Sequence, residues 1–256
     1  VDEGELHPWS TWPTVHRGVD NSKHKIKYIN QNITEANRKF PPIWKILLKN
    51  KIDIGIFGSL QSFPPLKGKN VKFYVPDTFS PVPETYPKSL KVFQEFNLKM
   101  TNDNKAITKN IDKKSFFLFY KLLISNKLSL ITLTTILLHL LKEKFNQIYK
   151  KRRSLIQPLL SFDIYFKELK NKNPSFTTFF SNHVAGMMHK YWKDLFSTNH
   201  NYKKPHQKSF NSNSIIEAMK IADRQIEKLK KYSDQNQYDL WVISSMGQNA
   251  IDRGDY

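Results

Sequence analysis

Apolar positions recur with two different periods in the first part of this chain. After a pair of prolines at residues 41–42 they follow helical spacing, and prolines fit the first turn of a helix. A short apolar run then covers residues 52–57 and ends at a Gly-Ser pair, and a second run covers residues 71–75 and ends at a proline. Short apolar runs closed by glycine or proline are typical of buried strands. The pattern therefore predicts a helix followed by two strands.

The last third of the chain returns to the same alternation. Residues 175–180 form a β-rich run, and Ser214 with Glu217 three positions later has the spacing of a helix capping box. The apolar residues of the helix that follows lie at steps of four and three, namely Ile215, Met219, Ala222, Ile226 and Leu229. This helix leads to an apolar run at residues 240–243, which we expect to be a fourth strand. Strands separated by helices predict an α/β fold, in which a mostly parallel sheet has helices on both faces.

The middle of the chain differs, with long apolar-periodic segments, many lysines and almost no glycine. We expect residues 89–172 to be a helical insertion between two parts of an α/β core, residues 1–88 and 173–256. The longest apolar stretch, residues 128–141, is shorter than the roughly 20 residues that a bilayer span needs. It predicts a buried helix, and no transmembrane segment is expected.

The charge of the chain raises the question of an anionic partner. The net charge is +19, which ordinarily indicates nucleic acid or an anionic membrane. Arginine, the usual reader of base edges and phosphate forks, is scarce among the 41 basic residues, so we expect a solvated basic surface and no specific nucleic-acid binding. The absence of cysteine excludes disulfides, thiolate metal sites and a cysteine nucleophile, and it agrees with a cytoplasmic location. Because the chain starts at Val1, we expect a piece of a longer protein.

The densest group of chemically useful residues is the segment from His7 to Gly18. Pro13 suits the first turn of a helix, which would place Thr11 or Trp12 at its cap. A hydroxyl group at that position faces free backbone N–H groups and the positive end of the helix dipole, which favour an alkoxide or a bound phosphate. The alternative is that Thr11 only caps the helix.

The Thr-Trp-Pro-Thr pattern at residues 11–14, with a glycine and then His24 downstream, resembles the nucleophile segment of type I phosphodiesterase and nucleotide pyrophosphatase proteins. These belong to the alkaline phosphatase superfamily, and in them a threonine followed by an aromatic residue and proline attacks phosphorus. The resemblance implies an alkaline phosphatase-like fold, Thr11 as the catalytic nucleophile and His16 as a substrate-binding residue.

Two later segments take the place of the metal-ligand motifs of that family. Residues 182–189 stand where the family has Asp-x-x-Gly-His, and the resemblance implies a substrate contact at Asn182 and a divalent metal ion, such as zinc, at His183 and His189. The alternative is that both histidines only form local hydrogen bonds. The last strand is followed by Ser-Ser-Met-Gly at residues 244–247 instead of Ser-Asp-His-Gly, and a hydroxyl and a thioether are poor ligands for zinc.

Three functions remain open from the sequence. The first is a hydrolase that cleaves a phosphate ester through Thr11, with a metal or cationic group to activate the hydroxyl. The second is a non-catalytic descendant of the same fold that binds a phosphorylated small molecule or glycan, or a partner protein. The third is a basic nucleic-acid-binding protein, for which no aromatic-basic repeat speaks. For the first two, the site is expected where the carboxyl ends of the strands meet, with Thr11, one of the two histidines and Ser245-Met246 in one cleft.

Overall fold

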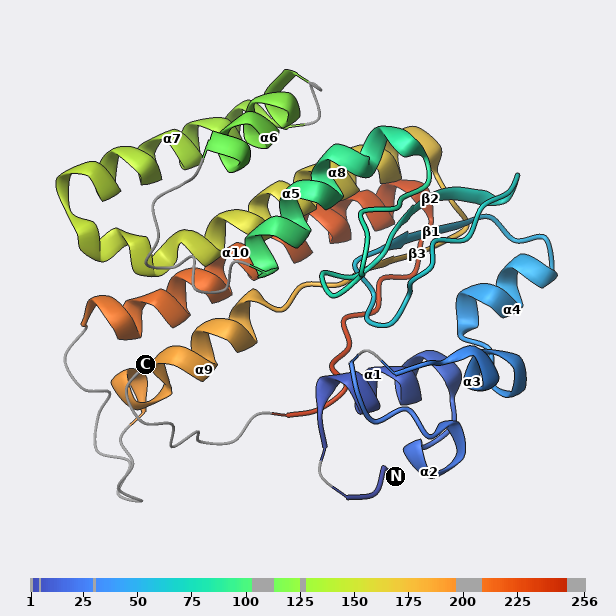
Figure 1. Cartoon of the computed structure of the whole chain (residues 1–256). Helices are drawn as coiled ribbons and strands as arrows, with labels where there is room; N and C mark the ends of the chain where they lie inside the picture. Colours follow the sequence, from blue (N-terminus) through green and yellow to red (C-terminus); the bar gives the residue numbers. More distant parts are fainter. Residues whose placement is uncertain are drawn as a thin grey trace. The chain divides into compact units, whose positions relative to one another are not determined.

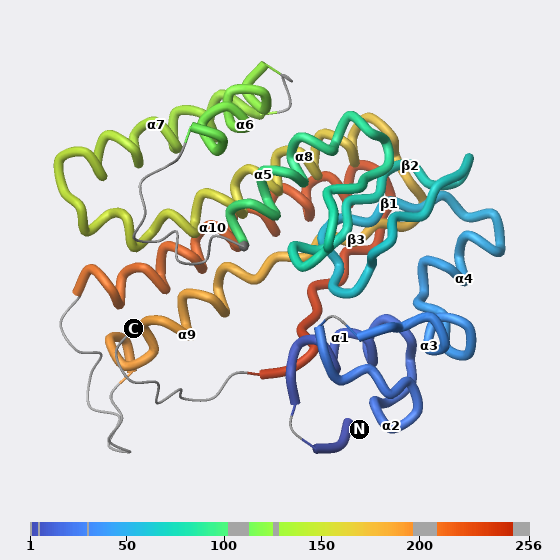
Figure 2. The backbone as a smooth tube through the Cα atoms, in the orientation of Figure 1, coloured from blue at the N-terminus to red at the C-terminus, as the bar shows by residue number. Residues whose placement is uncertain are grey.

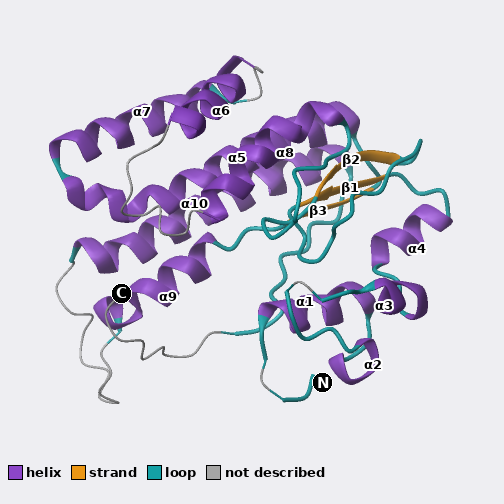
Figure 3. Ribbon diagram, in the orientation of Figure 1, coloured by secondary structure: helices purple, strands orange, loops and turns teal. Residues whose placement is uncertain are grey.

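Three strands form a parallel sheet in the computed structural model of this chain (Figures 1 and 3). The central strand β1 (Ile54–Phe57) lies between β2 (Val71–Val75) and β3 (Phe176–Phe179). In the register of the sheet, Gly55 pairs with Phe73 of β2 and with Thr177 of β3. The first three expected strands are therefore confirmed, and so is their parallel direction.

The structure describes residues 2–4, 6–29, 31–102, 113–124, 128–196 and 209–247. The chain divides into two compact units. Unit 1 contains Val1–Arg153 and Leu160–Phe180, and unit 2 contains Ser154–Leu159 and Ser181–Tyr256. All three strands belong to unit 1, and between β2 and β3 the chain passes through a series of helices (Figure 2).

The described helices have the following bounds: α1 (Pro8–Arg17), α2 (Asn21–His24), α3 (Thr34–Lys39), α4 (Ile43–Lys49), η1 (Lys88–Leu90), α5 (Lys91–Asn102), α6 (Lys113–Ile124), α7 (Leu130–Phe145), η3 (Gln147–Leu155), α8 (Ile156–Lys172), α9 (His183–Leu195) and α10 (Phe210–Asn236). The apolar stretch 128–141 thus lies mostly in helix α7, as expected. The division into a core and an insertion at residues 89–172 stays a prediction, since compactness alone does not say which segment was inserted.

Helices pack on both faces of the sheet. On one face, Trp44 of α4 packs against Ile54 and Ile56 of the central strand. On the other face the ring of Tyr165 from α8 lies 5.8 Å from Phe57 and 6.1 Å from Phe73. Because side chains alternate along a strand, residues 54 and 56 meet α4 while residue 57 meets α8. The expected α/β class is confirmed, whereas the alkaline phosphatase-like fold stays a prediction.

Unit 2 is built on the pair α9 and α10, in which Met187 and Tyr191 pack with Ile215 and Ala218. Helix α10 begins at Phe210, where the Ser209 hydroxyl accepts a hydrogen bond from the Ser212 N–H. The expectation that Ser214 opens this helix is therefore wrong, because an earlier serine caps it.

The expected apolar face of α10 is only partly buried. Ile215 is fully buried, but Met219 and Ile226 are 40% and 38% exposed. Together with Val184 of α9 and Ala222, these two side chains line an open apolar hollow on unit 2.

The expected fourth strand is wrong. Residues 240–243 form no strand, and Trp241, Val242 and Ile243 are 82%, 66% and 54% exposed. A strand needs a partner edge for its backbone N–H and C=O groups, and this segment has no ladder hydrogen bonds to another described strand. The residue types of this segment thus favour a strand, but within the described residues the segment does not pair with one.

Candidate functional site

Helix α1 lies beside the carboxyl ends of two strands in unit 1. The ring of Trp9 is 6.2 Å from that of Phe79, shortly after β2, and the ring of Trp12 is 5.3 Å from that of Phe180, directly after β3. Both contacts are edge-to-face, a favourable geometry for aromatic pairs. The segment that carries the nucleophile-like motif is thus positioned at the edge of the sheet where ligands of parallel α/β folds bind.

The start of α1 differs from the expectation. The helix begins at Pro8, with His7 as its cap residue, and Pro13 lies inside it. Proline favours the first helical position because its missing N–H is not needed there, and in this helix Pro8 occupies that position. Thr11 therefore lies one turn into the helix and not at its cap.

Thr11 is 3% exposed, and its hydroxyl donates a hydrogen bond of 3.0 Å to the carbonyl oxygen of His7. Each residue turns an α-helix by about 100°, so the side chain of Thr11 is rotated by about 100° from Trp12 and about 160° from Trp9, which face the strand ends. The hydroxyl is therefore held within the helix, on a different side from the aromatic contacts with the sheet edge.

The other polar residues of the motif form a hydrogen-bond chain. The backbone N–H of Ile26 donates to His24 Nδ1 at 3.0 Å, so in the neutral ring the proton is on Nε2. His24 Nε2 lies 2.9 Å from the Thr14 hydroxyl, which in turn donates to Asp2 Oδ1 at 2.7 Å. Burial, followed by the charge of Arg17, lowers the pKa of His24. His24 therefore acts as a neutral donor that ties the N-terminal segment to α1 and α2.

His16, the expected substrate-binding residue, is packed between two aromatic rings. Its ring centroid is 4.8 Å from that of Trp44 and 5.6 Å from that of Trp12. Burial and the neighbouring charge of Arg17 lower the pKa of His16 to about 3. The imidazole ring is thus uncharged at neutral pH and packs against Trp44 and Trp12. The role of His16 in substrate binding stays a prediction.

A cavity of about 40 Å³ has Trp44 in its lining. It is lined by Asn37, Pro42, Trp44, Lys45, Gln61, Ser62, Phe63, Pro64, Leu66 and Tyr74. Since a water molecule needs about 10–15 Å³ by this measure, the cavity has room for a few waters or a small polar group. Sequence reasoning missed it, because its lining comes from α4, β2 and the loop after β1.

Ser62 is the notable residue of this cavity. Its backbone is held on both sides, since the Tyr74 hydroxyl donates to the Ser62 carbonyl at 2.8 Å and the Ser62 N–H donates to Asp77 Oδ2 at 3.3 Å. The side chain is 4% exposed, and among the described residues its hydroxyl has no hydrogen-bond partner. A buried hydroxyl without a partner costs roughly 1–3 kcal/mol, so a ligand or water is expected to satisfy it.

Asp77 is a loop residue two positions after the end of β2. It is 4% exposed just after β2, and its second oxygen accepts the backbone N–H of Phe79 at 2.9 Å. Burial raises its pKa. Its carboxylate thus joins the loop after β1 to the loop after β2.

Two cations adjoin the cavity. The guanidinium of Arg17 donates to the carbonyl of Phe40 at 2.6 Å and to Asn37 Oδ1 at 2.9 Å. Burial lowers the pKa of Arg17 to about 10, and burial together with the charge of Arg17 lowers the pKa of Lys45. Neither cation has a carboxylate partner within the described residues. Both partly buried cations are therefore without a contacting carboxylate among the described residues, since the nearby Asp77 carboxylate is bound to backbone N–H groups.

The expected metal ligands lie in unit 2 on helix α9, both before the kink at Tyr191. His183 uses both ring nitrogens: Nδ1 lies 2.7 Å from the Ser181 hydroxyl and Nε2 lies 3.0 Å from the carbonyl of Ala218. Burial lowers its pKa to about 4. His189 lies six residues further along α9, hence on a different face, and Asn182 is the cap residue before the helix.

Both ring nitrogens of His183 already have polar neighbours, and metal binding at His183 and His189 stays a prediction. Across the ranges that the structure describes, no three His, Cys, Asp or Glu side chains gather where they could hold a metal ion. The expected cleft that would join Thr11 with a histidine and Ser245-Met246 stays a prediction, since these residues belong to different units.

No family model, curated protein or solved structure matches the chain. The fold is therefore assigned at the level of its class, and the site is argued from its own geometry. None of the described helices is long and apolar enough to cross a bilayer.

Proposed function

We propose that unit 1 binds the phosphate group of a phosphorylated small molecule or glycan in the cavity beside Lys45, without hydrolysing it. The observation that carries the proposal is the pair of partly buried cations, Arg17 and Lys45, without a carboxylate among the described residues. Taking charges out of water costs several kcal/mol per ion unless a counter-charge compensates. A bound dianion would supply that compensation.

The rest of the cavity fits the same ligand chemistry. The Ser62 hydroxyl is free to donate a hydrogen bond to a phosphate oxygen, and the ammonium group of Lys45 offers three donors. Arg17 adjoins the cavity through Asn37, so it contributes long-range charge while its guanidinium keeps its contacts with α3. A cavity of about 40 Å³ suits the head of one oxyanion, with the rest of the ligand outside.

Isothermal titration with inorganic phosphate and with glucose 6-phosphate tests this proposal. Hydrogen bonds to charged groups contribute roughly 1.5–3 kcal/mol, so Lys45→Gln should weaken binding at least about tenfold. Lys49→Gln, one turn along the same helix and exposed, is the matched control and should bind as the wild type does. If neither probe gives a binding heat with the wild type, or if Lys45→Gln binds with the same affinity as the wild type, the cavity holds only water.

Hydrolysis through Thr11 is the second candidate, favoured by the contacts that place α1 beside the strand ends. It requires the Thr11 hydroxyl to leave its bond to His7 and become accessible. Turnover of p-nitrophenyl phosphate, assayed with and without added zinc, tests it. Activity that is lost in Thr11→Ala but kept in Ser10→Ala, with unchanged circular dichroism, would establish this candidate. An inactive wild type that still binds phosphate would establish the first.

A further inference from the structure

Helix α7 exposes its apolar side. Six of its large apolar residues form one stripe of the helix surface and are each at least 44% exposed, namely Leu130, Ile131, Leu137, Leu138, Leu141 and Phe145, whereas Ile136 on the other side is 4% exposed. We call these six residues the α7 stripe. At about 100° per residue they span roughly 120° of the helix. The helix was expected to be buried, so this exposure corrects the sequence-based expectation. An apolar patch of this kind on a protein surface is typical of an interaction site.

The opposite side of α7 is buried and mixed in character, with Ile136 between the polar residues Thr132 and Glu143. Near the C-terminal end, Arg153 donates bidentate hydrogen bonds of 2.6–2.9 Å to Glu143, whose Oε1 also lies 3.0 Å from His139 Nε2. At the N-terminal end, the Ser129 hydroxyl and N–H both donate to Asp163 Oδ2 at 2.8 Å. Charge-assisted contacts at both ends fix the rotation of the helix. The α7 stripe therefore faces outward because the opposite side is anchored by these contacts and by the burial of Ile136.

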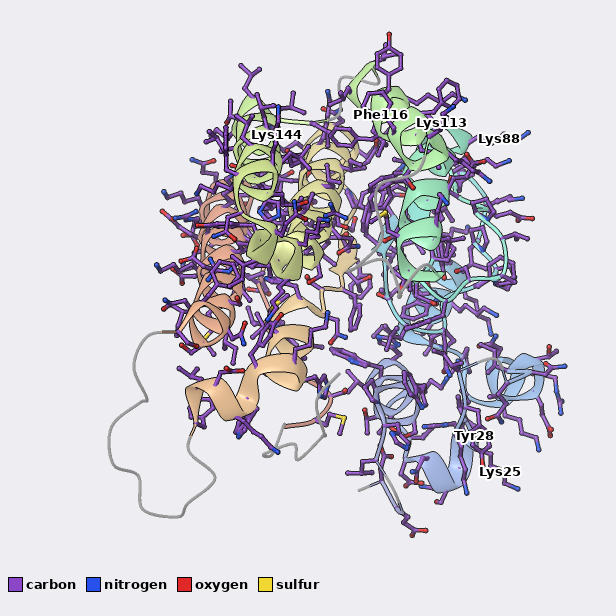
Figure 4. The ribbon with its side chains drawn as sticks, turned by 60° about the vertical axis from the view of Figure 1, so that its left-hand side comes forward. Lys25, Tyr28, Lys88, Lys113, Phe116 and Lys144 are labelled. Carbon is purple, nitrogen blue, oxygen red and sulfur yellow. The ribbon has the colours of Figure 1, made fainter. Side chains whose placement is uncertain are left out.

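The chain segment that carries the α7 stripe has charges almost entirely of one sign. Between residues 113 and 153 the only acidic residue is Glu143, which is 5% exposed and bound to Arg153. The basic residues of this segment are Lys113, Lys114, Lys121, Lys127, Lys142, Lys144, Lys150, Lys151, Arg152 and Arg153. Figure 4 shows Lys144 near the end of α7, and Lys113 and Phe116 at the start of α6. The segment thus presents apolar side chains among cations and no exposed anion.

Helix α6 repeats this combination. Phe116, Phe117, Tyr120 and Ile124 are 67%, 54%, 52% and 63% exposed, and Lys121 lies 4.4 Å from the Phe117 ring centroid. Aromatic and aliphatic side chains next to lysines are the composition of helices that lie in the headgroup region of a bilayer.

We propose that the α7 stripe and the exposed apolar face of α6 dock on the surface of an anionic phospholipid bilayer. The lysines match the negative lipid headgroups, and the leucines and phenylalanines reach the acyl boundary. A helix of 16 residues is about 24 Å long, so α7 lies in the interface and does not span it. Nucleic acid would satisfy the cations but leave the α7 stripe in water, which favours the bilayer.

The absence of cysteine permits a single-site test on the full chain. Leu138→Cys, labelled with an environment-sensitive fluorophore, is mixed with vesicles of phosphatidylcholine containing 30% phosphatidylserine at 0.15 M salt. The emission should shift to shorter wavelength with these vesicles and hardly change with pure phosphatidylcholine. The same label at Lys49→Cys, exposed on α4, is the matched control and should not respond.

Charge variants test the electrostatic part by vesicle sedimentation. Each lysine near an anionic surface changes binding about fivefold, so Lys142→Gln with Lys144→Gln should weaken it about 25-fold. Lys220→Gln with Lys230→Gln, both exposed on α10, should leave it unchanged.

Four results would overturn the proposal. A blue-shifted emission of the Leu138 label without vesicles, independent of protein concentration, would mean that another part of the chain covers the α7 stripe. A shift that depends on protein concentration would indicate a second copy. Binding to random duplex DNA but not to vesicles would assign the charge to nucleic acid. No vesicle binding by the folded wild type would reject the bilayer directly.

Discussion

The substitution Gly55→Ala tests the packing of the sheet on which the site rests. A Cβ added at Gly55 would lie 2.3, 2.6 and 2.8 Å from three carbons of the Phe73 ring. Carbon atoms in contact are ordinarily about 3.5–4.0 Å apart, so the ring would have to retreat by about 1 Å. Phe73 is fully buried and its ring lies 6.1 Å from that of Tyr165. The ring therefore has nowhere to move without displacing α8.

The size of the effect follows from two opposing contributions. Overpacking a well-filled core costs about 1–3 kcal/mol. Replacing glycine by alanine in a strand returns about 0.5–1 kcal/mol, because the unfolded chain loses freedom. Because the added Cβ would lie well inside van der Waals contact, its cost lies in the upper part of that range, at about 2–3 kcal/mol. Less about 1 kcal/mol for the glycine, the net loss in the free energy of unfolding is about 1–2 kcal/mol. For a chain of this size about 2–4 °C of melting temperature corresponds to 1 kcal/mol, which gives a decrease of roughly 2–8 °C.

Urea unfolding followed by circular dichroism measures this loss. Gly186→Ala is the matched control, because a Cβ there has no atom within 4 Å and helix α9 favours alanine, so a gain of about 0.5–1 kcal/mol is expected. Adding Phe73→Leu to Gly55→Ala should cost less than the sum of the single losses, since the smaller side chain relieves the contact. A neutral or stabilising Gly55→Ala would refute the described approach of β1 and β2.

Three further predictions concern other parts of the chain. Glu143→Gln removes the carboxylate that accepts from Arg153, which is 13% exposed, and should cost roughly 3 kcal/mol in urea unfolding. Adding Arg153→Met should recover part of that loss, and a double variant no better than the single one would contradict this. Because burial lowers the pKa of His183 from 6.5 to about 4, the unfolded chain binds the proton first. The corresponding stability, roughly 3 kcal/mol, is complete above pH 6.5 and is lost as the pH falls towards 4. His183→Gln should flatten that dependence, and an unchanged slope would count against the buried neutral ring. Val242→Lys should lower aggregation in light scattering and alter stability by less than about 0.5 kcal/mol, since residue 242 is 66% exposed in a β-prone run; a loss above about 1 kcal/mol would show that this segment is packed.

The strands of the sheet could be predicted because each is a short apolar run with a clear end. Residues 52–57, for example, were predicted correctly because a central strand that is buried on both faces is apolar throughout and does not alternate between apolar and polar residues. Helix starts were harder, since two residues of the same type compete for one role. Pro8 and not Pro13 begins α1, and Ser209 and not Ser214 caps α10. Local propensity indicates which residue types favour a helix start. The surrounding chain determines which of two residues of that type lies at the start.

The cavity beside Lys45 could not be predicted from local patterns. Arg17, Lys45 and Ser62 come from separate segments, and nothing in their spacing connects them. One compositional signal was present, however. In a chain whose cations are mostly lysine, Arg17 and Arg153 both form several hydrogen bonds to fixed acceptors. A planar fork suits such sites better than an ammonium group, so scarce arginines are useful starting points in a lysine-rich sequence.

The exposed side of α7 shows why periodicity predicts a helix more reliably than its orientation. The apolar stripe of α7 is as regular as that of a buried helix, and hydrophobic burial alone would turn it inward. Two features of the opposite side fix the outcome: Ile136 is buried there, and the Glu143 carboxylate meets Arg153 and His139. If Glu143 and Arg153 both stayed in water, the folded chain would lose little free energy. Burying only one of the two charges would cost several kcal/mol. Once the pair is buried the helix cannot rotate, so its apolar side needs a partner from outside the described residues.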